Sequence, residues 1–237
     1  MTHDTQTDAD PGPEATPNAA DRLLDAALLN VPFDGWSEAT LRAATTETRI
    51  SAGLAKALFP RGAVDLALAY HKRGDDEMAR RFAAEDHSDL RYSEKVARAI
   101  RIRLELADRE LVRRGATLFA LPQHATDGAK AIWGSADAVW TALGDTSEDV
   151  SWYTKRMTLS GVYSATVLFW LGDDSLEQQA TWDFLDRRIA NVMQFEKAKA
   201  RATDSRLGQA LAKGPLALLS RLRAPQRPGD MPGSFGS

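Results

Sequence analysis

The chain has 237 residues, 43% of them hydrophobic, and a formal net charge of −3 at pH 7. This length and composition predict one domain, or one domain with a small appendage, built around a sizeable apolar core. Cysteine is absent, which excludes disulfides, thiolate nucleophiles and cysteine-based metal sites. A slightly negative chain has no general attraction to nucleic acid or anionic lipid, so any such attraction must be local.

Residues 1–18 predict a disordered acidic tail. They include four acidic residues, three prolines and no lysine or arginine. A mitochondrial transit peptide has the opposite composition, rich in arginine and poor in acids. We therefore expect a protein of the bacterial cytoplasm.

Residues 19–72 predict a head of three short helices followed by the start of a longer one. The first helix begins at Asp21 and ends around Pro32 and Gly35, and the second opens at Ser37 or Thr40. Ser51, or Thr48 before it, opens the third helix, Ala52 to Phe59, and Val64 begins the fourth. This order is typical of a helix-turn-helix unit.

The charges of this head do not favour DNA binding. From residue 21 to residue 70 it holds five bases and six acids, and only Ser51 and Lys56 of the third helix are suited to contact a phosphate or a base edge. Duplex binding requires several phosphate contacts together with base-reading side chains. We therefore expect no nucleic-acid partner, and a ligand-responsive DNA-binding regulator stays as the alternative function.

Residues 73–200 predict a helical body. It begins with a charged surface segment, Arg73 to Asp89, followed by one amphipathic helix, Leu90 to Arg114, which Gly115 ends. His124 to Leu143 forms the next helix, and another begins near Leu176. The tryptophans of the 124–143 helix, Trp133 and Trp140, alternate with alanines, a pattern that fits tight packing or a ligand space equally well.

The most apolar stretch of the body runs from Met157 to Leu171. It contains no charged residue, and its 15 residues are fewer than the roughly 20 that a membrane span needs. Apolar residues fall on every side of the helix it would form, which Gly172 ends. We interpret it as the central buried helix of the body.

The residues before this stretch combine aromatic and basic side chains. Trp152 and Tyr153 stand beside Lys155 and Arg156, at a helix start that Asp149 or Ser151 caps. The simpler interpretation is two core aromatics and two solvated bases. The functional interpretation is a partner-docking patch, because tryptophan, tyrosine and arginine are enriched in binding hot spots.

From residue 196 onward the chain is basic, with eight bases and three acids between residues 196 and 237. Leucines recur at helical spacing over residues 201–223, which predicts a basic amphipathic helix that Gly214-Pro215 interrupts. It rests on a membrane surface or, alternatively, folds back on the body, and residues 224–237 form a disordered tail. The predicted membrane-surface residues are Arg206, Leu207, Leu211, Lys213, Leu218, Leu219, Arg221 and Leu222.

Motifs of catalysis and metal binding are missing from the sequence. None of the four histidines lies three positions after a glutamate, so the di-iron Glu-x-x-His element does not occur. The zinc-protease, P-loop and Gly-x-Ser-x-Gly motifs do not occur either. We expect no catalytic residues, no metal and no cofactor, and an enzyme is the less favoured alternative.

Several long motifs resemble one family. The chain is similar to the Coq-nine family of lipid-binding accessory proteins of ubiquinone (coenzyme Q) biosynthesis over roughly residues 21–199. The matching segments are Pro32-Phe-Asp-Gly-Trp-Ser37, Ser151-Trp-Tyr-Thr-Lys-Arg156, Leu159-x-Gly-Val-Tyr-Ser164, Asp173-Asp-Ser175 and Thr181-Trp-x-Phe-Leu185-x-x-Arg188-Ile189.

The resemblance implies an all-α fold of the TetR-regulator type without DNA binding or catalysis. It implies a peripheral protein of the inner membrane that binds isoprenoid quinone or phospholipid and assists the di-iron demethoxyubiquinone hydroxylase. By fold analogy, the last two long helices of the body pair in a homodimer. We expect the lipid near Trp133, Trp140, Met157, Val162 and Tyr163, and the hydroxylase at Asp149, Trp152, Tyr153, Lys155 and Arg156.

Overall fold

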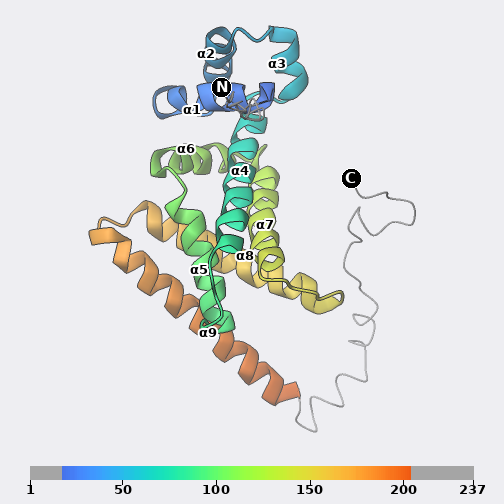
Figure 1. The fold of residues 1–237 in the computed structure, drawn as a ribbon, viewed down its shortest axis with the longest axis vertical. Helices are drawn as coiled ribbons and strands as arrows, with labels where there is room; N and C mark the ends of the chain where they lie inside the picture. The colour runs from blue at the N-terminus through green and yellow to red at the C-terminus, as the bar shows by residue number, and fades with distance from the viewer. Residues whose placement is uncertain (1–17, 204–237) are drawn as a thin grey trace, which may run out of the picture. The chain divides into compact units, whose positions relative to one another are not determined.

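The computed structural model describes residues 18–203, with side chains described through residue 194. Over this range the chain is helical (Figure 1), which confirms the predicted all-α class. The predicted amphipathic helix at 201–223 and both predicted tails lie outside the described residues, apart from the last residues of the final helix and Asn18. The helices are α1 (Ala19–Asp34), α2 (Glu38–Thr48), α3 (Ala52–Leu58), α4 (Ala63–Ala84), α5 (Tyr92–Glu105), α6 (Arg109–Phe119), α7 (Ala125–Ala142), α8 (Val150–Leu171) and α9 (Gln179–Thr203), with a 3₁₀ turn at Leu176–Gln178.

The described chain divides into two compact units at Ala67, inside α4. The first unit holds α1, α2, α3 and the start of α4, where the sequence predicts the helix-turn-helix head. Side-chain caps set its helix starts: Asn18 accepts from the backbone N–H of Asp21, and Ser37 and Ser51 cap α2 and α3. The helix start predicted at Asp21 is therefore wrong, because Asn18 is the cap and α1 begins at Ala19.

The second unit holds the remainder of α4 and the helices α5 to α9. Helix α8 packs against both α7 and α9, and α5 packs against α7 and α9. The buried apolar side chains of these helices form one core. Its larger members include Met78, Phe82, Ile100, Ile102, Leu104, Leu159, Tyr163, Trp170, Trp182 and Leu185.

The predicted helix from Leu90 to Arg114 is in fact two helices, α5 and α6. The break falls at residues 106–108, where the Asp108 carboxylate accepts from the backbone N–H groups of Glu110 and Leu111 and so begins a new helix. Aspartate at this position offers the backbone an alternative to continued helical hydrogen bonds. Gly115, the predicted end, lies inside α6.

The segment predicted as charged surface, Arg73 to Asp89, belongs largely to α4, which continues to Ala84. Met78 and Phe82 of this segment are buried in the core of the second unit. Asp75 is also buried, with 6% of its surface exposed. The many charges on the remaining faces of the helix concealed this inward stripe.

Asp75 anchors a buried polar cluster that joins α4, α5 and α7. Arg103 Nε donates to Asp75 Oδ1 over 2.7 Å, and Ser135 Oγ donates to the same oxygen over 2.8 Å. Gly74 allows this approach, since a Cβ there would lie 2.6 Å from the Arg103 guanidinium carbon. His71 Nε2 lies 2.7 Å from Ser135 Oγ. Because the serine proton is used on Asp75, His71 Nε2 must be the donor in this contact.

This cluster predicts a pH-dependent stability. Burial lowers the pKa of His71 below its ordinary value of 6.5, and nearby Arg103 acts in the same direction while Asp75 opposes it. A depressed pKa means that the unfolded chain binds the proton first, so the stability is fully present above pH 6.5 and is lost as the pH falls. We expect thermal melts of the wild type to shift downward between pH 7 and pH ~5.5, and melts of His71→Gln to shift less. Parallel shifts of the two proteins would contradict this.

The sequence predicted that α8 is buried on every side. In the structure one side of the helix is exposed. Leu159, Val162, Thr166 and Trp170 face the core, whereas Met157 and Leu168 are each 68% exposed. Phe169, which follows Leu168 in the chain, is 38% exposed and stacks on Phe184 of α9. Within residues 18–203, no helix combines the length and hydropathy needed to cross a membrane.

Candidate functional site

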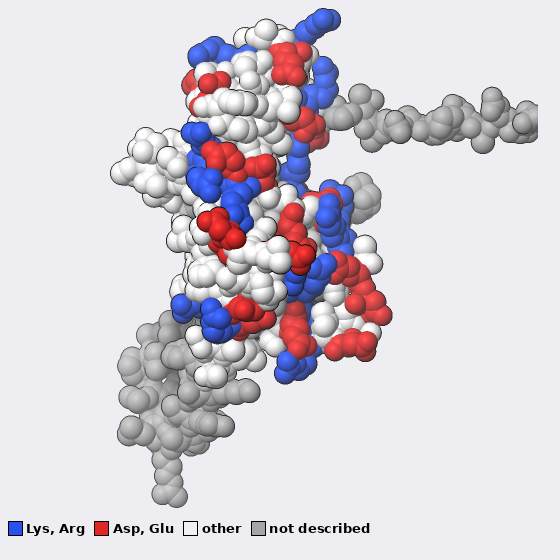
Figure 2. Space-filling view, turned by 90° about the vertical axis from the view of Figure 1, so that its left-hand side faces the viewer, with Lys and Arg blue, Asp and Glu red and all other residues white. Residues whose placement is uncertain are grey.

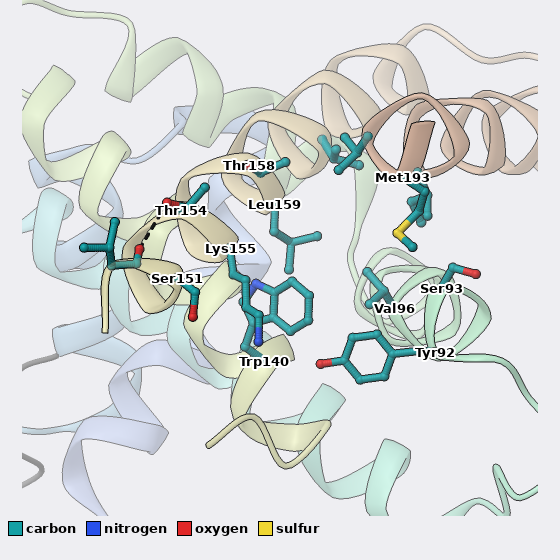
Figure 3. Close-up of a pocket in the computed structure, with 14 residues that line it drawn as sticks. Tyr92, Ser93, Val96, Trp140, Ser151, Thr154, Lys155, Thr158, Leu159 and Met193 are labelled. Carbon is teal, nitrogen blue, oxygen red and sulfur yellow. Dashed lines mark hydrogen bonds between the residues drawn. The ribbon is translucent and has the colours of Figure 1, made fainter. Parts of the chain in front are cut away.

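A mostly apolar pocket of about 460 Å³ opens within the second unit, between α5, α7, α8 and α9. Pockets of this size are typical of small-molecule sites. Figure 3 shows Tyr92 and Val96 of α5 facing Leu159 of α8, with Met193 of α9 above them. The lining residues are Tyr92, Ser93, Val96, Trp140, Val150, Ser151, Thr154, Lys155, Thr158, Leu159, Val162, Ile189, Val192 and Met193.

Two of the five residues predicted to contact lipid, Trp140 and Val162, line this pocket. The other three do not. Met157 points to the exposed side of α8, and Trp133 packs against Trp152 with ring centroids 5.9 Å apart. Tyr163 is buried beside the cluster of Asp75 and Arg103, where burial raises its pKa.

The sequence interpretation missed most of the α5 and α9 wall. Val96 and the stripe of Ile189, Val192 and Met193 have the spacing of inward helix faces. That spacing shows that each helix faces inward, but it does not show that the two faces meet around a space. The hydroxyl of Tyr92 and the ammonium of Lys155 were not expected there at all.

The start of α8 is organised as predicted around a capping aspartate. Asp149 accepts from the backbone N–H and the hydroxyl of Ser151. Trp152 and Tyr153 follow in the first turns, both half-buried, with their rings in an edge contact 4.8 Å apart. Asp149, Trp152 and Tyr153 thus lie together at one end of the helix.

Arg156 does not belong to an exposed patch, which corrects the prediction for this residue. Its side chain is 0% exposed, and its Nε donates to Asp137 Oδ1 over 2.5 Å. A second nitrogen, Nη1, donates to Asp145 Oδ2 over 3.3 Å, and the guanidinium lies 4.0 Å from the centroid of the Trp152 ring. Arg156 therefore holds α7, the following loop and α8 together, and its side chain is buried within the chain.

Lys155 lies both at the predicted docking patch and in the lining of the pocket. Its Nζ donates to Asp145 Oδ1 and to Ser147 Oγ, each over 2.6 Å, and its stem lines the pocket. Burial would raise the pKa of Asp145, but hydrogen bonds from Lys155 and Ser147 outweigh burial and hold that pKa below its ordinary value. Asp145 is thereby a fixed anion that positions the ammonium of Lys155.

The two side chains of the head that were candidates for DNA contact, Ser51 and Lys56, form hydrogen bonds within the head instead. Ser51 Oγ accepts from the backbone N–H of Leu54, and Lys56 Nζ donates to the carbonyl of Pro60. On the face drawn in Figure 2, bases and acids lie next to one another instead of forming a single basic surface. Neither observation favours duplex binding.

No group of three or more histidine, aspartate or glutamate side chains with metal-binding geometry occurs among residues 18–203. The buried carboxylate of Asp75 is paired with Arg103 and lies outside the pocket lining. The pocket itself carries one charged residue, Lys155. Its chemistry is therefore that of an apolar container with a few hydrogen-bonding groups.

Comparison with a solved structure defines the class of the fold. The TetR transcriptional regulator from Nitrosomonas europaea superimposes with a TM-score of 0.58, covering 72% of this chain and 95% of that chain at 20% identity. This similarity establishes an all-α TetR-like fold. At this identity it carries no information on function.

Sequence comparison finds similarity to one family. The COQ9 family model matches residues 125–196, which include α7, α8, the first two-thirds of α9 and the whole of the predicted docking patch. The chain is 29% identical to the ubiquinone biosynthesis protein COQ9, mitochondrial, of Xenopus tropicalis over 86% of this chain and 66% of that protein. It is 25% identical to the human protein of the same name over 81% of this chain and 62% of that protein. The chain is similar to these COQ9 proteins and spans just under two thirds of their length.

Proposed function

We propose that this protein is a noncatalytic lipid-binding accessory protein of ubiquinone biosynthesis. It binds an isoprenoid quinone intermediate and presents it to the demethoxyubiquinone hydroxylase at the membrane. The observation that carries the proposal is the apolar pocket of about 460 Å³ between α5, α7, α8 and α9. Similarity to COQ9, whose name in the relatives is ubiquinone biosynthesis protein, supports the biosynthetic context.

The pocket is expected to present the lipid more than to store it. Burying an isoprenoid chain is favourable by roughly 25 cal/mol per Å² of apolar surface, and a bilayer already provides this gain. The protein can therefore add only the positioning of the ring at a protein surface. Mass spectrometry of lipids that co-purify with the chain tests the proposal: isoprenoid quinones support it, and their absence from protein purified out of a quinone-producing host contradicts it.

The docking surface in this proposal consists of Asp149, Trp152, Tyr153 and Lys155, without Arg156. Asp149 is exposed and both aromatic rings are half-buried. Such partly exposed aromatic residues are typical anchors of protein interfaces. The membrane-surface residues between Arg206 and Leu222 remain a prediction, since they lie outside the described residues. The inner bacterial membrane remains the expected location.

A substitution at Tyr153 tests this surface. Tyr153→Lys places a charge where an aromatic anchor is expected, so we expect at least about a tenfold loss of affinity for the hydroxylase in surface plasmon resonance. Helix content by circular dichroism should be unchanged. Thr126→Lys adds the same charge at an exposed position of α7 and serves as the control. Equal affinities of the two variants would remove Tyr153 from the docking surface.

A homodimer is the proposed assembly, through exposed apolar residues of α8 and α9. Met157, Leu168 and Phe169 of α8 are exposed, and Phe169 stacks on Phe184 of α9. Exposed apolar patches of this kind mark interaction sites. Sedimentation equilibrium should give twice the chain mass of 25.9 kDa, and a wild-type monomer at micromolar concentration would contradict the assignment.

A further inference from the structure

The polar groups of the pocket are concentrated where α5, α7 and the start of α8 meet. Figure 3 shows the Tyr92 hydroxyl directed toward Trp140 and Lys155, whereas Met193 lies farther from them, near Val96 and Ser93. The rings of Tyr92 and Trp140 are stacked with centroids 5.8 Å apart. The pocket therefore has a polar end beside these rings and an apolar end formed by Val96, Ile189 and Val192.

Two hydrogen-bond donors at the polar end have spare capacity. A lysine ammonium has three donors, and Asp145 and Ser147 account for two of those of Lys155. The Tyr92 hydroxyl has no hydrogen-bond partner among the residues that the structure describes. A tyrosine hydroxyl is protonated at neutral pH and can donate, and partial burial raises the pKa of Tyr92 further.

The position of Lys155 is fixed before any ligand binds. Asp145, whose side chain is 4% exposed, holds the ammonium through a 2.6 Å salt bridge, and the ammonium lies 5.6 Å from the centroid of the Trp140 ring. A donor that is already held in place loses little conformational freedom when a ligand arrives. A charged donor also forms a stronger hydrogen bond than a neutral one.

We propose that Lys155 and Tyr92 bind acceptor oxygens on the ring of the lipid and so set its orientation in the pocket. The ring lies at the polar end beside Trp140, and the isoprenoid chain lies along Val96, Ile189 and Val192. This inference rests on the proposed function, because it assigns residues and a direction to the same pocket. It makes Lys155 and Tyr92 specificity-determining residues for ligands whose ring carries acceptor oxygens.

The experiment compares two ligands that share a ten-carbon chain. Decylubiquinone carries ring oxygens and decylbenzene carries none, and each is titrated against a fluorescent lipid that occupies the pocket. For Tyr92→Phe and Lys155→Met we expect about a tenfold weaker affinity for decylubiquinone and an unchanged affinity for decylbenzene. Lys130→Met, an exposed lysine of α7, is the matched control and should bind both ligands like the wild type.

The outcomes separate this inference from the proposed function. If neither ligand displaces the lipid from the wild type, lipid binding itself is contradicted. If both bind and Tyr92→Phe has the same affinity as the wild type for decylubiquinone, only the orientation is overturned. Equal losses for the two ligands in either variant also overturn it. Tyr92→Phe keeps the test decisive even if Lys155→Met fails to fold, because the Tyr92 hydroxyl has no structural partner among the described residues.

Discussion

Replacing Arg156 by alanine is expected to lower the free energy of unfolding by about 3–5 kcal/mol. The side chain is fully buried, and its removal leaves the carboxylate of Asp145 with Lys155 as its remaining cation. A buried charge that loses a partner costs more than the pair itself contributes, because water cannot replace the lost contact. Urea unfolding followed by circular dichroism measures the loss.

Arg80→Ala is the control for this prediction. Arg80 is 73% exposed and pairs with Glu77 within α4, so its loss should cost no more than about 1 kcal/mol. A change of less than 1 kcal/mol in Arg156→Ala would contradict the structural role of Arg156. Arg156→Ala is also expected to weaken hydroxylase binding, since the start of α8 loosens. Such a result would report on folding, and only Tyr153→Lys reports on docking.

Thr158→Trp is expected to lower the amount of co-purified isoprenoid quinone at least about tenfold, a difference of ~1.4 kcal/mol in binding. Thr158 lines the pocket, so the indole occupies space that the lipid requires. Met157→Trp is the matched control on the adjacent residue, which is 68% exposed and does not line the pocket. Lipid mass spectrometry of both variants measures the difference.

The same pair of variants tests the sequence-based assignment of Met157 to the lipid. If Met157→Trp lost the quinone and Thr158→Trp kept it, the lipid would lie on the outer side of α8 and the pocket would not be its site. Thermal melts of the two variants show whether lipid was lost because the variant unfolded, since an unfolded protein retains no lipid. The measurement is interpreted only for variants with wild-type helix content.

Local signals allowed the starts of α2, α3 and α8 to be predicted. Ser37, Ser51 and Asp149 act as caps, and Gly172 ends α8, because each of these effects depends on residues within one turn. The break before α6 was missed because Asp108 resembles any surface acid in a continuing amphipathic pattern. Whether such an aspartate caps a new helix depends on the packing of the helices that flank it.

The pocket and the burial of Arg156 depend on contacts between distant segments. Val96 of α5 and Val192 of α9 meet across the pocket, although 96 positions separate them. Arg156 carried one overlooked signal, because it falls on the same face of α8 as Leu159, Tyr163 and Trp170. A base on an apolar face indicates a buried ion pair, but the sequence does not show that Asp137 and Asp145 are the partners.

The first turns of α8 contribute residues both to the pocket and to the docking surface. This shared helix links lipid binding to hydroxylase binding. Thr154 and Lys155 form the pocket wall, while Tyr153 between Trp152 and Thr154 belongs to the docking surface. One rigid helical turn cannot shift for the lipid without also shifting the residues offered to the hydroxylase. Thermodynamic reciprocity then sets the relation: whatever factor the quinone adds to the affinity for the hydroxylase, the hydroxylase adds to the affinity for the quinone.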